Sequence, residues 1–348
     1  MAILDCNDDI DAYHSAEVTL GRDDQAEMRK RRDAGRTRLR TGLAGKGHPL
    51  PSEQDSQGSY AMRTMHQDGQ CDYDIDDGAY FEKDDLKDAV GVHLSPLAAR
   101  ERVCEALQQD DRLKYPASVK TNCVRQKYPE GYHIDIPVYR IVRETNWKGE
   151  EVVKYQLASG DNWVVQDARA VTRWYNRLVG ELNAGESDGS QLRRLTKLTK
   201  KQARSRIAWK SNTTSGICMT KLIVDHFVAV PGRDDEALLQ TWKAIHAKLA
   251  WTQRIAHPVM AGRNLAEEGD AEVKYFRDRL GEALNTLKVL EDAKCTREQA
   301  RKAWDIVFNT SFFSSRPSDD DEDTRGRGPF IVTSQEVARR NDGDRRFG

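Results

Sequence analysis

The pattern of hydrophobic and polar positions divides the chain into two parts. Up to about residue 160, short runs of alternating apolar and polar residues follow one another, the period of half-buried β-strands. From about residue 162 onward, apolar residues recur at helical spacing in almost every segment. The pattern therefore predicts an α+β fold, with a mixed β-sheet and helices first and a helical part after it.

The same pattern predicts the individual elements. In the first part we expect helices over residues 10–43 and 98–109, and extended segments over 120–127, 132–142 and 152–157. In the second part we expect helices over residues 167–182, 192–209, 217–230, 235–255, 270–292 and 296–309. Residues 185–190 are rich in Gly and Ser and predict a flexible link. The expected division is 1–160, 161–316 and a disordered tail, 317–348, whose charged start lacks apolar residues.

Composition narrows the class of protein. The chain has 55 basic and 56 acidic residues, a net charge of -1, so we expect neither strong nucleic-acid binding nor attraction to acidic membranes. Its start is acidic, and no run approaches the roughly 20 apolar residues of a spanning helix. Six cysteines lie scattered without a C-x-x-C pair: Cys6, Cys71, Cys104, Cys123, Cys218 and Cys295. These features predict a soluble cytoplasmic protein with reduced thiols.

Alternating carboxylates in residues 72–78 are the strongest chemical signal. Successive side chains of a strand point to opposite faces, so Asp72, Asp74 and Asp76 would share one face. Like charges so close together require a counter-charge, and a divalent metal provides one. The segment fails as an EF-hand loop, because its sixth and twelfth positions hold Asp77 and Lys83. We therefore interpret it as part of a two-metal nucleotidyl-transfer site.

A further carboxylate and several basic residues are weaker signals. Asp135 lies in an alternating strand, where a buried carboxylate requires a partner or a metal. The arginines of residues 28–40 suit either a solvated helix face or a basic rim over a nucleotide cleft. Lysines in the helix after residue 192 are open to the same two interpretations. His226, His246 and His257 lack ligand spacing and are interpreted as packing or surface residues.

Four short motifs resemble those of the polymerase-β-like nucleotidyltransferases. They are Gln57-Gly58-Ser59, Asp74-x-Asp76-Asp77-Gly78-x-Tyr80, Cys123-Val124-Arg125 leading into His133-Ile134-Asp135-x-Pro137-x-Tyr139, and Ser159-Gly160-Asp161 running to Trp174. More narrowly, the chain resembles the bacterial cGAS/DncV-like nucleotidyltransferases (CD-NTases), and among these the DncV type, the cyclic GMP-AMP synthases. The resemblance covers roughly residues 10–312 and implies a catalytic lobe with an N-terminal helix and a helical lobe closing a central cleft.

The resemblance also implies roles for individual residues. Asp74, Asp76 and Asp135 would be catalytic and would bind two Mg²⁺ ions, with Mn²⁺ as a possible substitute. The nucleotide-binding residues would be Gln57, Gly58, Ser59, Met62, Arg125, Gln166, Lys200 and Ser215. The lysine motif departs from the family pattern, so Lys197 and Lys201 stay alternatives to Lys200. Asp72 then becomes a neighbour of the ligands.

The function implied is synthesis of a 3′,3′-linked cyclic dinucleotide from ATP and GTP as a second messenger in anti-phage (CBASS) defence. Cyclic GMP-AMP is the favoured product, and another cyclic di- or trinucleotide or a linear oligoadenylate is the alternative. Transfer to an RNA 3′ end is disfavoured by the lack of positive bias. The resemblance further implies that Gly348 is joined to targets by an E1/E2-like, ubiquitin-like conjugation partner.

Overall fold

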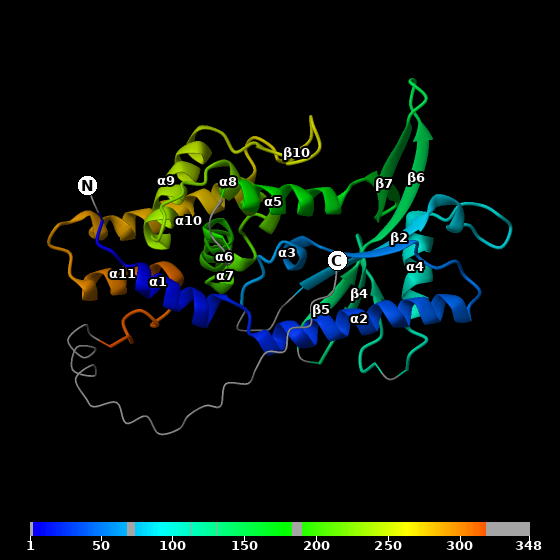
Figure 1. Cartoon of the computed structure of the whole chain (residues 1–348), viewed down its shortest axis with the longest axis horizontal. Helices are drawn as coiled ribbons and strands as arrows, with labels where there is room; N and C mark the ends of the chain where they lie inside the picture. The colour runs from blue at the N-terminus through cyan, green and yellow to red at the C-terminus, as the bar shows by residue number, and fades with distance from the viewer. Residues whose placement is uncertain (1–2, 68–73, 112, 130, 183–189, 318–348) are drawn as a thin grey trace, which may run out of the picture.

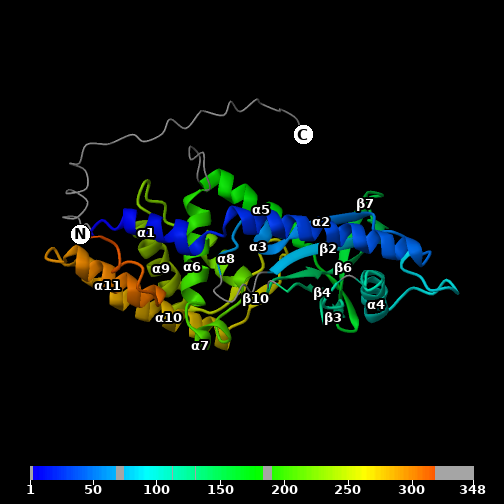
Figure 2. The ribbon, with the colours of Figure 1, turned by 90° about the horizontal axis from the view of Figure 1, so that it is seen from below.

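A computed structural model describes residues 3–67, 74–111, 113–129, 131–182 and 190–317. A group of strands with two covering helices lies beside a group of helices (Figure 1). The view turned by 90° shows the same side-by-side arrangement (Figure 2). The predicted α+β class, with a mixed sheet followed by a helical part, is confirmed.

An eight-stranded mixed sheet forms the first group. Its strands are β1 (Glu53–Gln57), β2 (Asp74–Glu82), β3 (Ser118–Val119), β4 (Val124–Lys127), β5 (His133–Ile136), β6 (Val138–Thr145), β7 (Glu151–Ser159) and β8 (Asn162–Val165). They are ordered β3-β4-β5-β2-β6-β7-β8, and β1 pairs with β2 outside this path. β5 and β6 both run parallel to β2 and are separated by Pro137. Proline has no N–H to donate, which explains the interruption.

Two helices cover one face of this sheet. They are α2 (Arg22–Gly45) and α4 (Pro96–Leu107), and their apolar side chains share a core with β2, β4 and β5. The helices cross closely at Gly42, where an added Cβ would lie 2.0 Å from the carbonyl oxygen of Ala106. The arginines of α2 turn to the sheet and its surroundings: Arg36 pairs with Asp77, and Arg38 pairs with Asp110. These contacts place Arg36 and Arg38 on the back of the sheet, away from the cavity between the two groups of elements, whereas Arg29 in the same segment is exposed.

The second group is helical and includes the first described residues of the chain. It contains α1 (Asn7–Tyr13), a π-helical turn (His14–Val18), α5 (Ala168–Leu182), α6 (Gln191–Ala203), α7 (Ile207–Lys210), α8 (Gly216–Asp225), α9 (Asp234–Trp251), α10 (Ala271–Leu287) and α11 (Arg297–Phe308). A short hairpin, β9 (Ile255–Ala256) and β10 (Asn264–Ala266), completes it. Tyr13, Trp242, Trp304 and Phe308 are fully buried in its core.

A buried carboxylate ties the beginning of the described chain to its end. Asp9 is 2 % exposed and pairs with Arg301 at 3.1 Å and Arg316 at 2.9 Å. Removing one partner of such a buried ion pair would leave an uncompensated charge, so the network holds α1 against α11. α1 is therefore part of the helical group, although its residues come first in the sequence.

The predicted elements are found with shifted ends. The expected helix over 10–43 is interrupted before α2, and the expected helix over 192–209 ends at Ala203. The strands β1, β3, β8, β9 and β10 were not predicted; β1 has the sequence Glu-Gln-Asp-Ser-Gln, without an apolar side. None of the helices in the described ranges is long and apolar enough to cross a membrane. The domain boundaries stay a prediction, and the expected disordered tail lies outside the described residues except for Pro317.

Candidate active site

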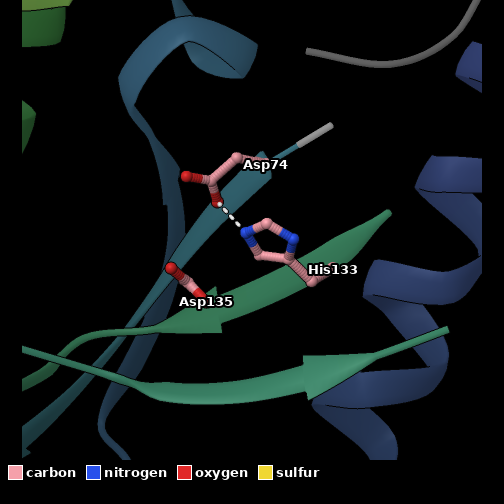
Figure 3. Close-up of side chains that lie close together, drawn as sticks. All are labelled: Asp74, His133 and Asp135. Carbon is pink, nitrogen blue, oxygen red and sulfur yellow. Dashed lines mark ion pairs between the residues drawn. The ribbon is translucent and has the colours of Figure 1, made fainter. Parts of the chain in front are cut away.

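Two parallel strands bring four polar side chains together. β2 and β5 pair with Asp74 opposite His133 and Asp76 opposite Asp135. Because side chains alternate along a strand, all four point to the same face of the sheet. Figure 3 shows Asp74, His133 and Asp135, with Asp74 above the His133 ring and Asp135 to its lower left. The alternation expected for Asp74 and Asp76 is found, whereas Asp72 lies outside the described residues.

The deeper pair consists of Asp76 and Asp135. Asp135 is 6 % exposed and accepts two hydrogen bonds from Arg125, Nε–Oδ1 at 2.7 Å and Nη2–Oδ2 at 2.6 Å. Burial, and then the Asp135 carboxylate, hold the pKa of Asp76 well above its usual range, while Arg125 acts in the opposite direction. A second carboxylate close to Asp135 is thus disfavoured as an anion until additional positive charge arrives.

The outer pair consists of Asp74 and His133. His133 Nε2 lies 3.6 Å from Asp74 Oδ1. Asp74, His133 and Asp135 each offer a ligand atom, and these atoms lie within 4.8 Å of one another. Two carboxylates and an imidazole are a donor set that divalent metals accept. The residues present therefore fit a metal ion. The raised pKa of the neighbouring Asp76 also indicates that the site requires positive charge.

A glycine turn approaches the carboxylates from β1. Gly58 has φ +62°, and an added Cβ would lie 2.3 Å from Asp76 Oδ2. Only glycine satisfies both the left-handed backbone and this close approach. The preceding Gln57 is 3 % exposed; its amide donates to the Tyr80 hydroxyl at 2.6 Å and accepts from the Tyr139 hydroxyl at 3.1 Å. The turn that begins α3 (Gly58–Ala61) is thereby held against β2.

The helical group contributes a lysine from the other side. Lys200 is 4 % exposed, and its Nζ donates to Thr64 Oγ1 at 3.1 Å. Burial, and then the neighbouring Arg204, lower the pKa of Lys200 to about 7. An added Cβ on Gly216 would lie 3.8 Å from the Lys200 nitrogen. An anionic partner would stabilise the charged form of a lysine in such surroundings, because burial leaves that charge poorly solvated.

These residues surround one cavity of about 540 Å³ between the two groups of elements. Of the residues expected at the site, those that line it are Gln57, Gly58, Ser59, Met62, Asp74, Asp76, Asp135, Gln166 and Lys200. Two do not: Arg125 contacts Asp135 behind the lining, and Ser215 caps α8 while its neighbour Gly216 faces the cavity. Lys197 and Lys201 lie on other cavities, and Gly348 is outside the described residues.

Some lining residues were not anticipated as site residues. His257, interpreted as a packing or surface residue, lines the cavity, and its Nδ1 accepts from the N–H groups of Val259 and Met260. Thr64 and Arg204 were also missed. Thr64 lies five residues after Ser59 on the same loop, which is a signal that could have been used. Arg204 and His257 reach the cavity through tertiary packing alone.

Comparisons with known proteins agree with this site. Residues 53–139 match the family model "Cyclic GMP-AMP synthase DncV-like, nucleotidyltransferase domain", which spans β1 to the first residues of β6. The matched segment contains the glycine turn and all three aspartates.

Solved structures share the fold over most of the chain. Escherichia coli DncV bound to 3′-deoxy GTP is 16% identical, with a TM-score of 0.63 over 86% of this chain and 94% of that one. Vibrio cholerae DncV with the linear intermediate pppA(3′,5′)pG is 17% identical, with a TM-score of 0.65 over 86% and 93%. Escherichia coli CdnC with ATP is 16% identical, with a TM-score of 0.66 over 89% and 99%.

At such identities the structural likeness concerns the fold, and the sequence match concerns the domain that carries the aspartates. Both point to the same family, and the resemblance expected from the motifs is confirmed. Residues 53–139 thus match a DncV-like nucleotidyltransferase domain, within a fold that the chain shares with DncV and CdnC.

Proposed function

We propose that this protein makes a cyclic dinucleotide from ATP and GTP, with 3′,3′-cyclic GMP-AMP as the favoured product. The observation that carries the proposal is the convergence of Asp74, Asp76 and Asp135 with the Gly58–Ser59 turn and Lys200 on one cavity. Carboxylates suit divalent metals, whereas the turn and the lysine suit a triphosphate. Both halves of a nucleotidyl-transfer site are therefore within reach of one bound nucleotide.

Asp74, Asp76 and Asp135 would hold two Mg²⁺ ions, or Mn²⁺, with His133 beside them. Such ions lower the pKa of a ribose hydroxyl and stabilise the attacking and leaving oxygens of an in-line displacement. The backbone N–H groups and hydroxyl of the Gly58–Ser59 turn would orient the triphosphate. Lys200 would neutralise phosphate charge from the opposite wall, where its own charge is destabilised without an anion.

Arg125 has two roles in the proposed site. In the structure it neutralises Asp135, which keeps two adjacent carboxylates compatible. A carboxylate offers about four lone-pair positions, so Asp135 can accept from Arg125 and still contact a metal ion. Arg125 is also 29 % exposed at its side chain, which leaves part of the guanidinium for an acceptor nucleotide.

The relatives support the substrates. The Vibrio cholerae DncV structures contain a linear dinucleotide intermediate or a nonhydrolyzable GTP, and CdnC was solved with ATP. The second candidate is another cyclic di- or trinucleotide or a linear oligoadenylate, favoured by the equal likeness to CdnC, whose name does not specify a product. A role in cytoplasmic anti-phage signalling, and conjugation through Gly348, rest on the family resemblance alone.

The test is product analysis with the full chain. Mixed ATP and GTP with Mg²⁺ or Mn²⁺ are expected to yield cyclic GMP-AMP by mass spectrometry, and single nucleotides to yield less. Asp74→Ala combined with Asp76→Ala should abolish turnover. The circular dichroism spectrum should be retained, because the Asp76 carboxylate is destabilised as an anion by burial and the Asp74 carboxylate is partly exposed to solvent. Absence of any nucleotide product under these conditions would refute the proposal; a different cyclic product would favour the second candidate.

A further inference from the structure

A second cavity lies behind the glycine turn. It measures about 1160 Å³ and is formed by the π-helical turn, the start of α2, α3 with the residues after it, and α6. We call it the rear cavity. The chain bends between α1 and α2 (Figure 1), and Thr19 and Leu20 from this stretch line the cavity. No residue of the proposed metal centre lines it.

Positive charge is concentrated in the rear cavity. Its lining includes six cationic side chains and one carboxylate, that of Asp11; the cations are Arg22, Arg29, Arg63, Arg193, Arg194 and Lys197. His14 adds no charge near pH 7, because burial and Lys197 lower its pKa to about 4. The whole chain has a net charge of -1, so this excess is local. A concave surface of one charge sign focuses the field and attracts counter-ions.

Three of the six cations have no carboxylate to neutralise them. Among the described residues, no ion pair involves Arg22, Arg29 or Arg63, and all three are exposed to solvent. By contrast, Arg194 makes a double contact with the buried Asp234, and Arg193 donates to Asn176 Oδ1 at 3.1 Å. The cavity thus combines fixed arginines on α6 with arginines that are available for a ligand on α2 and after α3.

The backbone around the rear cavity carries two irregular features. Arg63 has φ +57°, in the left-handed region that favours glycine, and its N–H donates to the carbonyl oxygen of Tyr60 at 3.0 Å. The chain opposite forms a π-helical turn, His14–Val18, a geometry that is often found at functional sites. Glycine would be the less strained residue at position 63. An arginine there instead places a guanidinium at the cavity.

The rear cavity shares a wall with the catalytic cavity. Gly58, Ser59, Met62 and Thr64 line the catalytic cavity, Tyr60, Ala61 and Arg63 line the rear cavity, and Met65 lines both. Arg193 also donates from its Nε to the carbonyl oxygen of Met62 at 3.3 Å. A ligand held by these arginines would contact the nucleotide-binding loop from its other side.

We propose that the rear cavity binds a compact polyphosphate anion and that this anion steadies the loop carrying Gly58 and Ser59. One guanidinium group can donate two parallel hydrogen bonds to phosphate oxygens, which makes arginine a suitable residue for such a ligand. A small anion is favoured over a nucleic-acid strand, because the cations converge on a hollow and the chain as a whole has no net positive charge. Inorganic tripolyphosphate represents this class.

The experiment is calorimetric titration of the full chain with inorganic tripolyphosphate at low salt and in EDTA. Removing metal suppresses binding in the catalytic cavity, so the outcome does not depend on the proposed activity. The wild type is expected to bind, and Arg22→Ala combined with Arg29→Ala should weaken binding about 100-fold, at about tenfold for each charged hydrogen bond. Lys120→Ala combined with Lys274→Ala removes two exposed charges elsewhere and should change nothing.

Arg63→Gly separates binding from folding. It removes the third arginine and at the same time relieves the left-handed backbone, so binding should weaken about tenfold while the melting temperature is retained. The proposal would be overturned if the Arg22/Arg29 variant bound tripolyphosphate as tightly as the wild type does. It would also be overturned if the lysine control lost as much affinity as the Arg22/Arg29 variant. Loss of binding in Lys200→Met would overturn it as well, because that loss would place the anion in the catalytic cavity. Tighter binding of a 12-nucleotide DNA strand, lost in the same arginine variant, would assign a polymer instead.

Discussion

Lys200 allows the catalytic cavity to be tested through stability as well as activity. Its side chain is 4 % exposed, with a hydrogen bond to Thr64 and no carboxylate contact among the described residues. The pKa falls from 10.5 to about 7, chiefly through burial. Below pH 7 the lysine is charged in the folded and unfolded states alike, so the folded state bears the full desolvation cost. We predict that Lys200→Met stabilises the protein and impairs nucleotide binding.

The magnitude follows from the shift in pKa. A pKa lowered from 10.5 to about 7 corresponds to about 5 kcal/mol of destabilisation at low pH. Methionine fills a similar volume without charge, but it leaves the Thr64 hydroxyl without its partner, at about 1–3 kcal/mol. The net gain expected at pH 6 is therefore about 2–4 kcal/mol. Loss of one charge-assisted phosphate contact should weaken ATP binding about 10- to 100-fold.

The pH dependence of stability independently checks the predicted sign of the stability change in Lys200→Met. Between about pH 7 and 10.5 the unfolded state binds more protons at this lysine than the folded state does. Wild-type stability should therefore rise over this range relative to that of Lys200→Met, and the advantage of the variant should shrink. Urea unfolding at pH 6, 7, 8 and 9 measures this, with Lys201→Met as the control from the same helix. A variant that is less stable than wild type at every pH would refute the reasoning.

Two further substitutions test the glycine turn and the contact of α5 with the sheet. Gly58→Ala should lower turnover at least tenfold and reduce the melting temperature, because its methyl group would lie 2.3 Å from Asp76 Oδ2. The control is Gly91→Ala, which is also at positive φ but has nothing within 4 Å of the added methyl group. It should reduce stability less and leave turnover intact. Arg169→Ala removes a guanidinium that lies 4.1 and 4.3 Å from two tyrosine rings, and urea unfolding should show a loss of about 1–2 kcal/mol. Arg173→Ala, on an exposed ion pair, should lose less than about 1 kcal/mol, and equal losses would contradict a specific role for Arg169.

The paired aspartates were predictable from the sequence because strand periodicity is short-range. Asp74 and Asp76 share a face wherever the segment is extended, whatever surrounds it. The third ligand needed more information. Asp135 meets Asp76 through a parallel register between β2 and β5, and parallel strands are far apart in the sequence. Only the family resemblance joined the two segments in advance.

Other features depend on tertiary structure that residue patterns do not contain. β1 has polar residues on both faces, yet it is held by pairing to β2 and by the tyrosine contacts of Gln57. Lys197, Lys200 and Lys201 all lie within about one turn of α6. Which lysine reaches the catalytic cavity is decided by how α6 packs against the loop at Thr64, and helical periodicity alone cannot choose among them.

The residues from Gly58 to Met65 connect these observations, because the two cavities lie on either side of them. One side meets the carboxylates, where negative charge is in excess and the pKa of Asp76 is raised. The other meets arginines without carboxylate partners among the described residues. A triphosphate in the catalytic cavity would bring further negative charge to the loop, and that charge is stabilised by cations behind it as well as by Lys200 in front. The arrangement of charge across this loop thus favours binding of anions on both sides, with the glycine turn as the element that each would hold in place.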